Sequence, residues 1–185
     1  MALVPVYLLQ VCYGMNTGFP AILTPQLREN CSEFPISLDQ ASWIVSIDNL
    51  ATPVICILSG FLQQKYGPLR ILMFACLPYS LSWLIVFLAT SVYHLYLSRL
   101  LVGISHALLA TTVYTVEISS KEMRGTYSVL ESVLRCLGCV LIYALGFAQR
   151  WRQIALLAPI VPMAAFICAV LMAPESPVYL LAKKR

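Results

Sequence analysis

Six long apolar runs, separated by short polar connectors, constrain the fold of this chain more than any other feature. They lie at Ala2–Leu27, Ala41–Leu62, Leu69–Ala89, Tyr93–Val116, Tyr127–Ala148 and Gln153–Met172. Each run has about the 20 residues that a helix needs to cross a bilayer. A helix is required there because lipid offers the backbone no hydrogen-bond partners. We therefore expect an all-α membrane protein with six transmembrane helices.

The composition agrees with a bilayer environment, because hydrophobic residues make up 60% of the 185 residues and charged residues only 11%. A soluble domain carries roughly 25% charged residues, so this chain lacks the polar surface of a water-soluble protein. The formal net charge of +4 is too small to indicate a nucleic-acid partner, and no basic patch is interleaved with aromatic residues. The expected surroundings are therefore a lipid bilayer.

The basic residues predict an orientation, because an even number of crossings places both chain ends on one side of the membrane. The connectors and tail on that side contain most of the positive charges, at Lys65, Arg70, Lys121, Arg124, Lys183, Lys184 and Arg185. The opposite side contains Arg28, Arg150 and Arg152 beside the acidic Glu29, Glu33 and Asp39. Lys and Arg gather in cytoplasmic loops. We expect an integral protein of the plasma membrane with both termini in the cytoplasm.

The first outer connector contains Asn30-Cys31-Ser32, which matches an N-glycosylation sequon. Two interpretations stay open, glycosylation of Asn30 and a chance match. Met1 leads almost directly into the first apolar run, without a basic leader or a small-residue cleavage site. A signal peptide is therefore not expected.

Charge is concentrated in one connector, where Glu117, Lys121, Glu122 and Arg124 fall within eight positions. Lys121 and Glu122 suit an ordinary solvated turn. Glu117 differs because it ends an apolar run, and a carboxylate at membrane depth usually has a partner. Arg124 is the local candidate for that partner, and the charges of the other connectors on the same side are alternatives.

Four short blocks follow one another along the chain, within these runs or just after them. They read GFLQQKYGPLR at 60–70, RLLVGISHA at 99–107, VYTVE at 113–117 with RG at 124–125, and PESPVYL at 174–180. In this order and spacing, the blocks resemble the signatures of the sugar-porter family within the major facilitator superfamily. The stretch Asn16–Pro20, followed by Leu38–Ile44, is similar to the insect facilitated trehalose-transporter branch of that family.

The resemblance implies that residues 1–185 are the N-terminal six-span bundle of a twelve-span carrier, without its second bundle. In such carriers the substrate lies between two bundles, and alternating access rocks one against the other. The implied activity is facilitated diffusion of a hexose or a trehalose-like disaccharide, with no cofactor. The implied partners are the sugar, the bilayer, and a second six-span half or a second copy of this chain.

The resemblance also implies roles for single residues. Arg99 corresponds to an arginine in the bundle interior, although the residues alone also allow a side chain that snorkels to the outer face. In proton-driven relatives its partner is an Asp. Asn16 occupies that position here and does not titrate, so downhill transport without protons is expected. Asn16 alternatively is a helix-packing amide.

Two sets of residues take functional roles by the same resemblance. The residues expected at the central cavity are Asn16, Thr17, Ser132 and Arg135. The residues expected in a cytoplasmic ion-pair latch are Lys65, Arg70, Glu117, Arg124 and Glu175. The latch would hold one conformation until its charge pairs separate.

Several positions depart from the family pattern. Gln64 replaces an Asp, Pro68-Leu69 replaces a basic pair, and Val178 replaces an Arg. Mid-span Glu131 and Arg135 lie four apart on one helix face, where they either neutralise each other inside the bundle or line a polar cavity.

Asp48-Asn49 is a further polar pair within an apolar run, with no family counterpart. Together, these changes suggest a divergent or relaxed member of the family. The missing second half, the replaced basic pair and Val178 favour an alternative function. In that alternative, the chain is a non-transporting half-size membrane protein that pairs with itself or with a full-length transporter.

No catalytic or metal-binding pattern is visible in the sequence. His94 and His106 are too few for a metal site, and there is no H-E-x-x-H helix. Cys136 and Cys139 have redox spacing, but they lie inside an apolar run and are expected to pack. Gly103–Ala107 is a small-xxx-small pair that suits close helix contact. We expect no enzyme, no metal and no cofactor.

Overall fold

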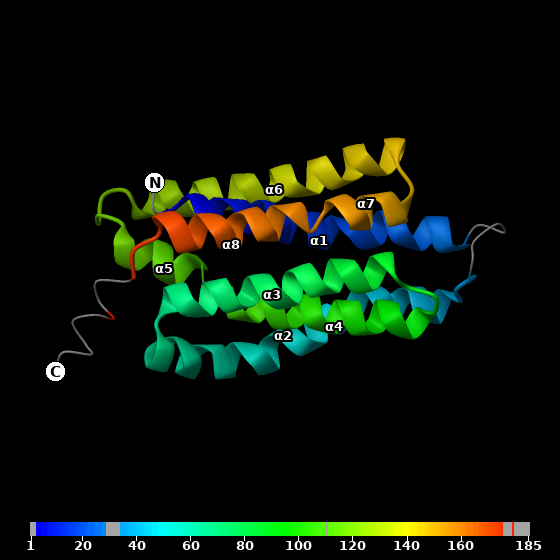
Figure 1. Ribbon diagram of the computed structural model, residues 1–185, viewed down its shortest axis with the longest axis horizontal. Coiled ribbons are helices and arrows are strands. Elements are labelled where there is room, and N and C mark those ends of the chain that lie inside the picture. The colour runs from blue at the N-terminus through cyan, green and yellow to red at the C-terminus, as the bar shows by residue number, and fades with distance from the viewer. Residues whose placement is uncertain (1–2, 29–33, 110, 176–178, 180–185) are drawn as a thin grey trace.

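The computed structural model describes residues 3–28, 34–109, 111–175 and 179, and within them it is helical without a β-strand. The described helices are α1 (Val4–Arg28), α2 (Leu38–Tyr66), α3 (Pro68–Phe87), α4 (Val92–Leu108), α5 (Thr111–Ile118), α6 (Arg124–Ala148), α7 (Trp151–Leu157) and α8 (Ile160–Met172). They lie along one common axis as a bundle (Figure 1). The expected all-α fold is confirmed.

Two of the expected apolar runs are each divided into two helices. The fourth run contains α4 and α5, which are separated around Leu109. The sixth contains α7 and α8, which are separated at Ala158–Pro159. Pro159 contributes to that interruption because it has no N–H for the helical ladder. Each divided pair continues along the bundle (Figure 1). With α1, α2, α3 and α6, the two pairs give the described helices six passes.

Within the described residues, five segments are long and apolar enough to cross a membrane. They are Leu38–Tyr66, Pro68–Phe87, Val92–Ile118, Arg124–Ala148 and Trp151–Met172. Helix α1 has 25 residues but is more polar, because Gln10, Asn16 and Thr17 lie in it. The protein is therefore an integral membrane protein, and α1 is well packed inside the bundle.

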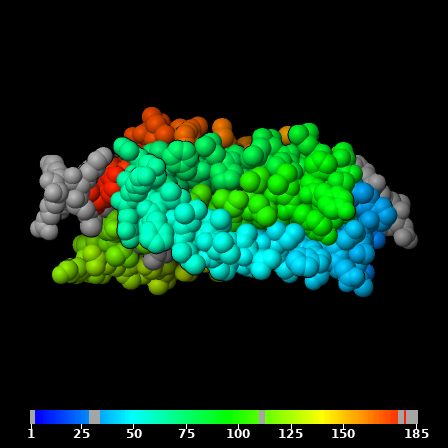
Figure 2. Space-filling view, turned by 90° about the horizontal axis from the view of Figure 1, so that it is seen from below, coloured from blue at the N-terminus to red at the C-terminus, as the bar shows by residue number. Residues whose placement is uncertain are grey.

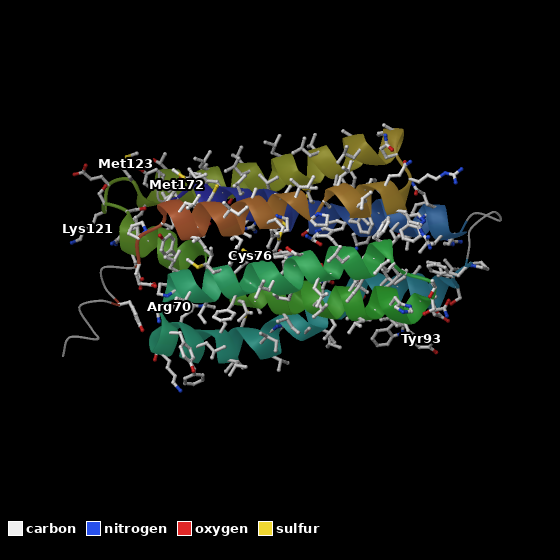
Figure 3. All side chains as sticks on the ribbon, in the orientation of Figure 1. Arg70, Cys76, Tyr93, Lys121, Met123 and Met172 are labelled. Carbon is white, nitrogen blue, oxygen red and sulfur yellow. The ribbon has the colours of Figure 1, made fainter. Side chains whose placement is uncertain are left out.

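The two ends of the bundle differ in their side chains. Helix α8 ends where α1 begins, and we call this the proximal end (Figure 1). Figure 3 shows Arg70 and Lys121 at the proximal end and Tyr93 at the opposite, distal end. The basic residues of two connectors thus share one end of the bundle, as the alternation of six passes requires.

A tight turn joins α2 to α3 at the proximal end. Gly67 has φ +92°, in the region that favours glycine. Pro68 follows at the first helical position, where its missing N–H costs nothing. A Cβ on Gly67 would lie 2.7 Å from Glu175 Oε1. The turn therefore needs glycine for its backbone angle and for the approach of Glu175.

Glycines let two pairs of helices approach closely. A Cβ on Gly14 of α1 would lie 1.9 Å from the Arg135 carbonyl oxygen of α6. A Cβ on Gly138 would lie 2.1 Å from the Val11 carbonyl oxygen. On the other side of the bundle, Gly103 of α4 packs against the backbone of Asp48 in α2. Small residues of this kind support close packing where lipid provides no hydrophobic drive between helices.

Helices α2 and α6 are the most exposed of the long helices. The apolar side chains exposed on α2 include Leu50, Val54, Ile57 and Phe61. Those exposed on α6 include Val129, Val133, Val140 and Phe147. Figure 2 shows α2 lying open along the length of one face. Exposed apolar area of this extent needs a cover of lipid or protein.

Candidate functional site

Arg99 lies in the bundle interior. Its side chain belongs to α4 and is 2% exposed. Its Nη1 donates a hydrogen bond of 3.1 Å to the Asn16 carbonyl oxygen of α1. The guanidinium carbon also lies 5.5 Å from the centre of the Phe19 ring, within the range of a cation–π contact. Arg99 therefore does not snorkel to the outer face.

Asn16 is buried in α1 beside Arg99. Its side-chain amide donates to the Cys12 carbonyl oxygen at 3.0 Å, within the same helix. The amide is thus satisfied locally, and the Asn16 backbone is what holds the arginine.

Asp48 is the buried carboxylate on the α2 side of this region. Its charge interacts electrostatically with Arg99, although no ion pair joins the two in the described structure. The Asn49 side chain donates to Asp48 Oδ1 at 3.4 Å, and Thr52 donates to the Asp48 carbonyl oxygen at 2.7 Å. Thr52 also donates to the Gly103 carbonyl oxygen at 3.3 Å. Asp48 therefore lies where α2 contacts α4.

A polar cavity of about 290 Å³ lies between α1, α2 and α4. Its polar and aromatic lining residues are Tyr13, Thr17, Thr24, Asp48, Asn49 and His106. The rings of Tyr13 and His106 are stacked, with centroids 3.9 Å apart and an interplanar angle of 24°. His106 Nε2 is buried and has no hydrogen-bond partner among the described residues. The cavity combines a carboxylate, an amide, hydroxyls and two aromatic rings.

A second polar network joins α1, α5 and α6. Gln10 donates to Glu131 Oε2 at 2.9 Å and accepts from Arg135 Nε at 3.2 Å. Thr115 of α5 donates to the other carboxylate oxygen of Glu131. The Arg135 guanidinium also lies 4.6 Å from the centre of the Tyr13 ring.

Gln10 and Thr115 are the members of this network that the sequence analysis missed. Glu131 is 2% exposed, and in the described structure no ion pair joins it directly to Arg135. The two therefore interact inside the bundle through Gln10. The signal was present, because a polar side chain in the middle of an apolar run needs a buried partner.

The two cysteines with redox spacing, Cys136 and Cys139, have different surroundings. Cys139 donates from its thiol to the Gly14 carbonyl oxygen at 3.2 Å, at the close approach of α1 and α6. Cys136 is exposed. The packing interpretation holds for Cys139.

Arg70 and Glu175 form an ion pair at the proximal end, with 3.9 Å between Nε and Oε2. Glu175 Oε1 also accepts from the Leu69 backbone N–H at 3.2 Å. Tyr114 of α5 donates to the Pro174 carbonyl oxygen at 2.8 Å. The connector after α8 is thus tied to α3 and to α5.

The other residues expected in the latch are not joined to this pair. Glu117 Oε2 and Arg124 Nε are each buried without a hydrogen-bond partner within the described parts of the chain. Lys65 is exposed and lies over the Tyr66 ring at 5.3 Å. Its carbonyl oxygen accepts from the Tyr179 hydroxyl at 3.1 Å. The structure brings together two of the five expected residues.

The four residues expected at a central cavity lie in different places. Thr17 lines the cavity between α1, α2 and α4, whereas Asn16 is buried behind it. Arg135 belongs to the Gln10 network. Ser132 is exposed on α6, in a shallow depression beside Cys136. Asn30, the sequon residue, lies outside the described residues.

The described residues contain no group of three or more His, Cys, Asp or Glu that could hold a metal ion. His94 interacts with Ser91 at 2.8 Å on the exposed start of α4, away from His106.

These features agree with the similarity of the sequence to known proteins. A profile of the family described as sugar (and other) transporter matches residues 2–185. The chain belongs to this family. The match extends over all the helices, so the polar interior described above lies within a sugar-transporter fold.

Three curated relatives show the range of similarity. The facilitated trehalose transporter Tret1 of Apis mellifera ligustica is 28% identical over 95% of this chain. The sugar transporter ERD6-like 6 of Arabidopsis thaliana is 30% identical over 91%. The solute carrier family 2 facilitated glucose transporter member 8 of Bos taurus is 27% identical over 94%. The aligned regions cover 35%, 34% and 37% of these relatives, so this chain spans about a third of their length.

Proposed function

We propose that this chain is the N-terminal six-span bundle of a carrier that moves a hexose or a trehalose-like disaccharide by facilitated diffusion. The family match over residues 2–185 is the observation that carries the proposal. Named relatives that transport trehalose and glucose support this substrate class. A second six-span half, or a second copy of the chain, would complete the substrate site. The carrier would use no cofactor and catalyse no reaction.

The exposed faces of α2 and α6 support a partner bundle. The partner bundle would cover part of these apolar faces, and lipid would cover the rest. In the proposed carrier the two bundles rock against each other around a central sugar. Asn16 occupies the position of a titratable group in proton-driven relatives. An amide neither takes up nor releases a proton near neutral pH, so it favours downhill transport that is not coupled to protons.

The proximal ion pair is the proposed conformational latch. Arg70 and Glu175 join the start of α3 to the connector after α8. Glu117, Arg124 and Lys65 would contribute their charges in another state, when the proximal end meets the partner bundle. Separation of such pairs releases one arrangement in favour of the other.

The orientation and membrane are part of the same proposal. Basic residues at the proximal end, including Arg70 and Lys121, favour a cytoplasmic position for that end. The plasma membrane is the proposed location, since an external sugar would be taken up there.

The alternative is a half-size membrane protein that pairs with itself or with a full-length transporter and does not transport. The replacement of a basic pair by Pro68-Leu69 in the turn near Glu175 favours this alternative. A latch with fewer charges would hold its conformation less firmly.

The first experiment is the mass of the native polypeptide in solubilised membranes, followed by counterflow of labelled glucose and trehalose in proteoliposomes. The native polypeptide, at whatever length it occurs, is purified for both. Sugar exchange that persists when a proton gradient is collapsed supports facilitated diffusion. Absence of exchange for every sugar, together with crosslinking to a full-length transporter, would establish the alternative.

A further inference from the structure

We infer that the cavity between α1, α2 and α4 binds the hydroxyl groups of a single sugar ring, with Asp48, Asn49 and His106 as its polar contacts. This inference rests on the proposed sugar-carrier function and names the part of this bundle that would hold the sugar. It replaces the expected set of four cavity residues, of which only Thr17 lines this cavity.

A second depression adjoins the cavity on the side of the distal end of the bundle. This wider depression is lined by Thr24, Arg28, Ala41 and Val45, among others. Thr24 and Val45 also line the polar cavity, so the two spaces adjoin. Arg28 is the last residue of α1, at the end opposite the Arg70–Glu175 pair. The two spaces together therefore extend from Arg28 to Asp48 between α1 and α2.

The polar lining retains free hydrogen-bonding capacity. Asp48 Oδ1 accepts a long hydrogen bond of 3.4 Å from the Asn49 side chain, and a carboxylate offers about four acceptor sites. The Thr17 hydroxyl donates to the Tyr13 carbonyl oxygen, which leaves its oxygen able to accept. His106 Nε2 has no partner in the described structure. Vicinal hydroxyls can satisfy such groups, because each is both a donor and an acceptor.

The aromatic lining supplies part of the apolar wall of the cavity. Tyr13 and His106 stack at 3.9 Å and present two nearly parallel rings beside the cavity. Ligand pockets combine apolar and aromatic walls with a few placed polar groups. Here, the stacked rings form the wall, and Asp48 and Asn49 supply the directional contacts.

The charges around the cavity favour a neutral ligand. Arg99 interacts electrostatically with Asp48, and the Arg135 guanidinium lies over the Tyr13 ring. These two cations oppose a positively charged solute, and Asp48 opposes a negative one. The volume of about 290 Å³ is at the lower limit of roughly 300 Å³ for small-molecule pockets, which suits one sugar ring and not two.

The test is equilibrium binding of labelled D-glucose to the purified native polypeptide, in competition with trehalose and with the cation D-glucosamine. Asp48→Asn is compared with Asp39→Asn, which removes the same charge from an exposed position of α2. His106→Phe keeps the ring stack and removes the ring nitrogens. Its control is His94→Phe, at an exposed position of α4.

The expected loss of glucose affinity is at least about ten-fold for Asp48→Asn, as for one charge-assisted hydrogen bond. For His106→Phe it is about three-fold or more, as for a neutral hydrogen bond. The two controls are expected to bind as the wild type. Glucosamine is expected to bind more weakly than glucose.

A variant that fills the cavity without changing Asp48 tests the inference even if Asp48→Asn disturbs folding. Val45→Trp fills the cavity from a side chain that is 47% exposed, and Val54→Trp adds the same ring at a 69% exposed position outside the lining. Val45→Trp is expected to abolish glucose binding and Val54→Trp to preserve it. Equal binding by both variants overturns the inference, as does tighter binding of glucosamine than of glucose.

Failure of the inference and failure of the proposed function give different results. If the wild type binds and exchanges glucose while the cavity variants match their controls, the sugar binds elsewhere and the carrier function stands. If the wild type neither binds nor exchanges any sugar, both are wrong.

Discussion

Gln10 of α1 donates a hydrogen bond to Glu131 of α6, with 2.9 Å between Nε2 and Oε2. The same side chain accepts from Arg135 at 3.2 Å. One neutral amide thus separates a buried carboxylate from a guanidinium. Hydrogen bonds to charged groups are stronger than neutral ones, and an orphaned buried charge is costly. Gln10 is therefore expected to stabilise the contact between α1 and α6.

Replacing Gln10 by Leu is expected to lower the free energy of unfolding by about 1–2 kcal/mol, since it removes the shared partner of Glu131 and Arg135. Thermal unfolding in detergent micelles measures the change. Gln64→Leu, at an exposed position of α2, is the matched control. Equal stability of the two variants would contradict this assignment.

Gly14→Ala is expected to destabilise the bundle by about 2 kcal/mol or more, because the new methyl group would lie 1.9 Å from the Arg135 carbonyl oxygen. Gly60→Ala is the control, since a Cβ there meets nothing within 4 Å. It is expected to stabilise α2 by up to about 1 kcal/mol through helix propensity. Thermal unfolding distinguishes the two, and a neutral Gly14→Ala would show that the helices separate readily.

Arg99→Leu is expected to destabilise the protein by about 1–3 kcal/mol, because it removes a buried guanidinium that donates to the Asn16 carbonyl oxygen and interacts electrostatically with Asp48. Combining it with Asp48→Asn should cost less than the sum of the single changes. The double-mutant cycle, measured by unfolding, reports the coupling free energy directly. Strict additivity would mean that the two charges act independently.

Glu175→Gln is expected to change stability by less than about 1 kcal/mol, because the Arg70 side chain of the pair is 59% exposed. Its effect should instead fall on the conformational equilibrium, measured as a change in the rate of sugar counterflow. Glu122→Gln removes an exposed charge from the connector between α5 and α6 and serves as the control. Identical exchange rates for the two variants would show that Glu175 is not part of the latch.

Much of the fold was predictable from the sequence. Apolar length alone indicates helices that cross a bilayer, because no other single-segment structure satisfies its backbone there. The interruptions near Leu109 and at Ala158–Pro159 were not predicted. Both lie inside apolar runs. The hydropathy of the sequence does not change at such a break, because the helices before and after it are both surrounded by lipid or protein.

The site was predictable only in part. Motif positions singled out Arg99, Thr17 and the Arg70–Glu175 region, and the structure places each of them in a defined contact. The cavity lined by Asp48, Asn49 and His106 was not anticipated, because the Asp48-Asn49 pair belongs to α2, His106 belongs to α4, and no motif joins them.

The sequence by itself determined that this chain is a helical membrane protein of a sugar-transporter family, since composition and ordered blocks need no knowledge of packing. Only the tertiary structure decided which polar groups meet. Glu131 and Arg135 share a helix face but are joined through Gln10, which is 121 positions from Glu131. In a membrane protein both the packed and the lipid-facing sides of a helix are apolar. The hydrophobic periodicity therefore does not determine how each helix is rotated about its own axis. Close contacts determine that rotation, such as the approach of Gly14 in α1 to the backbone of α6.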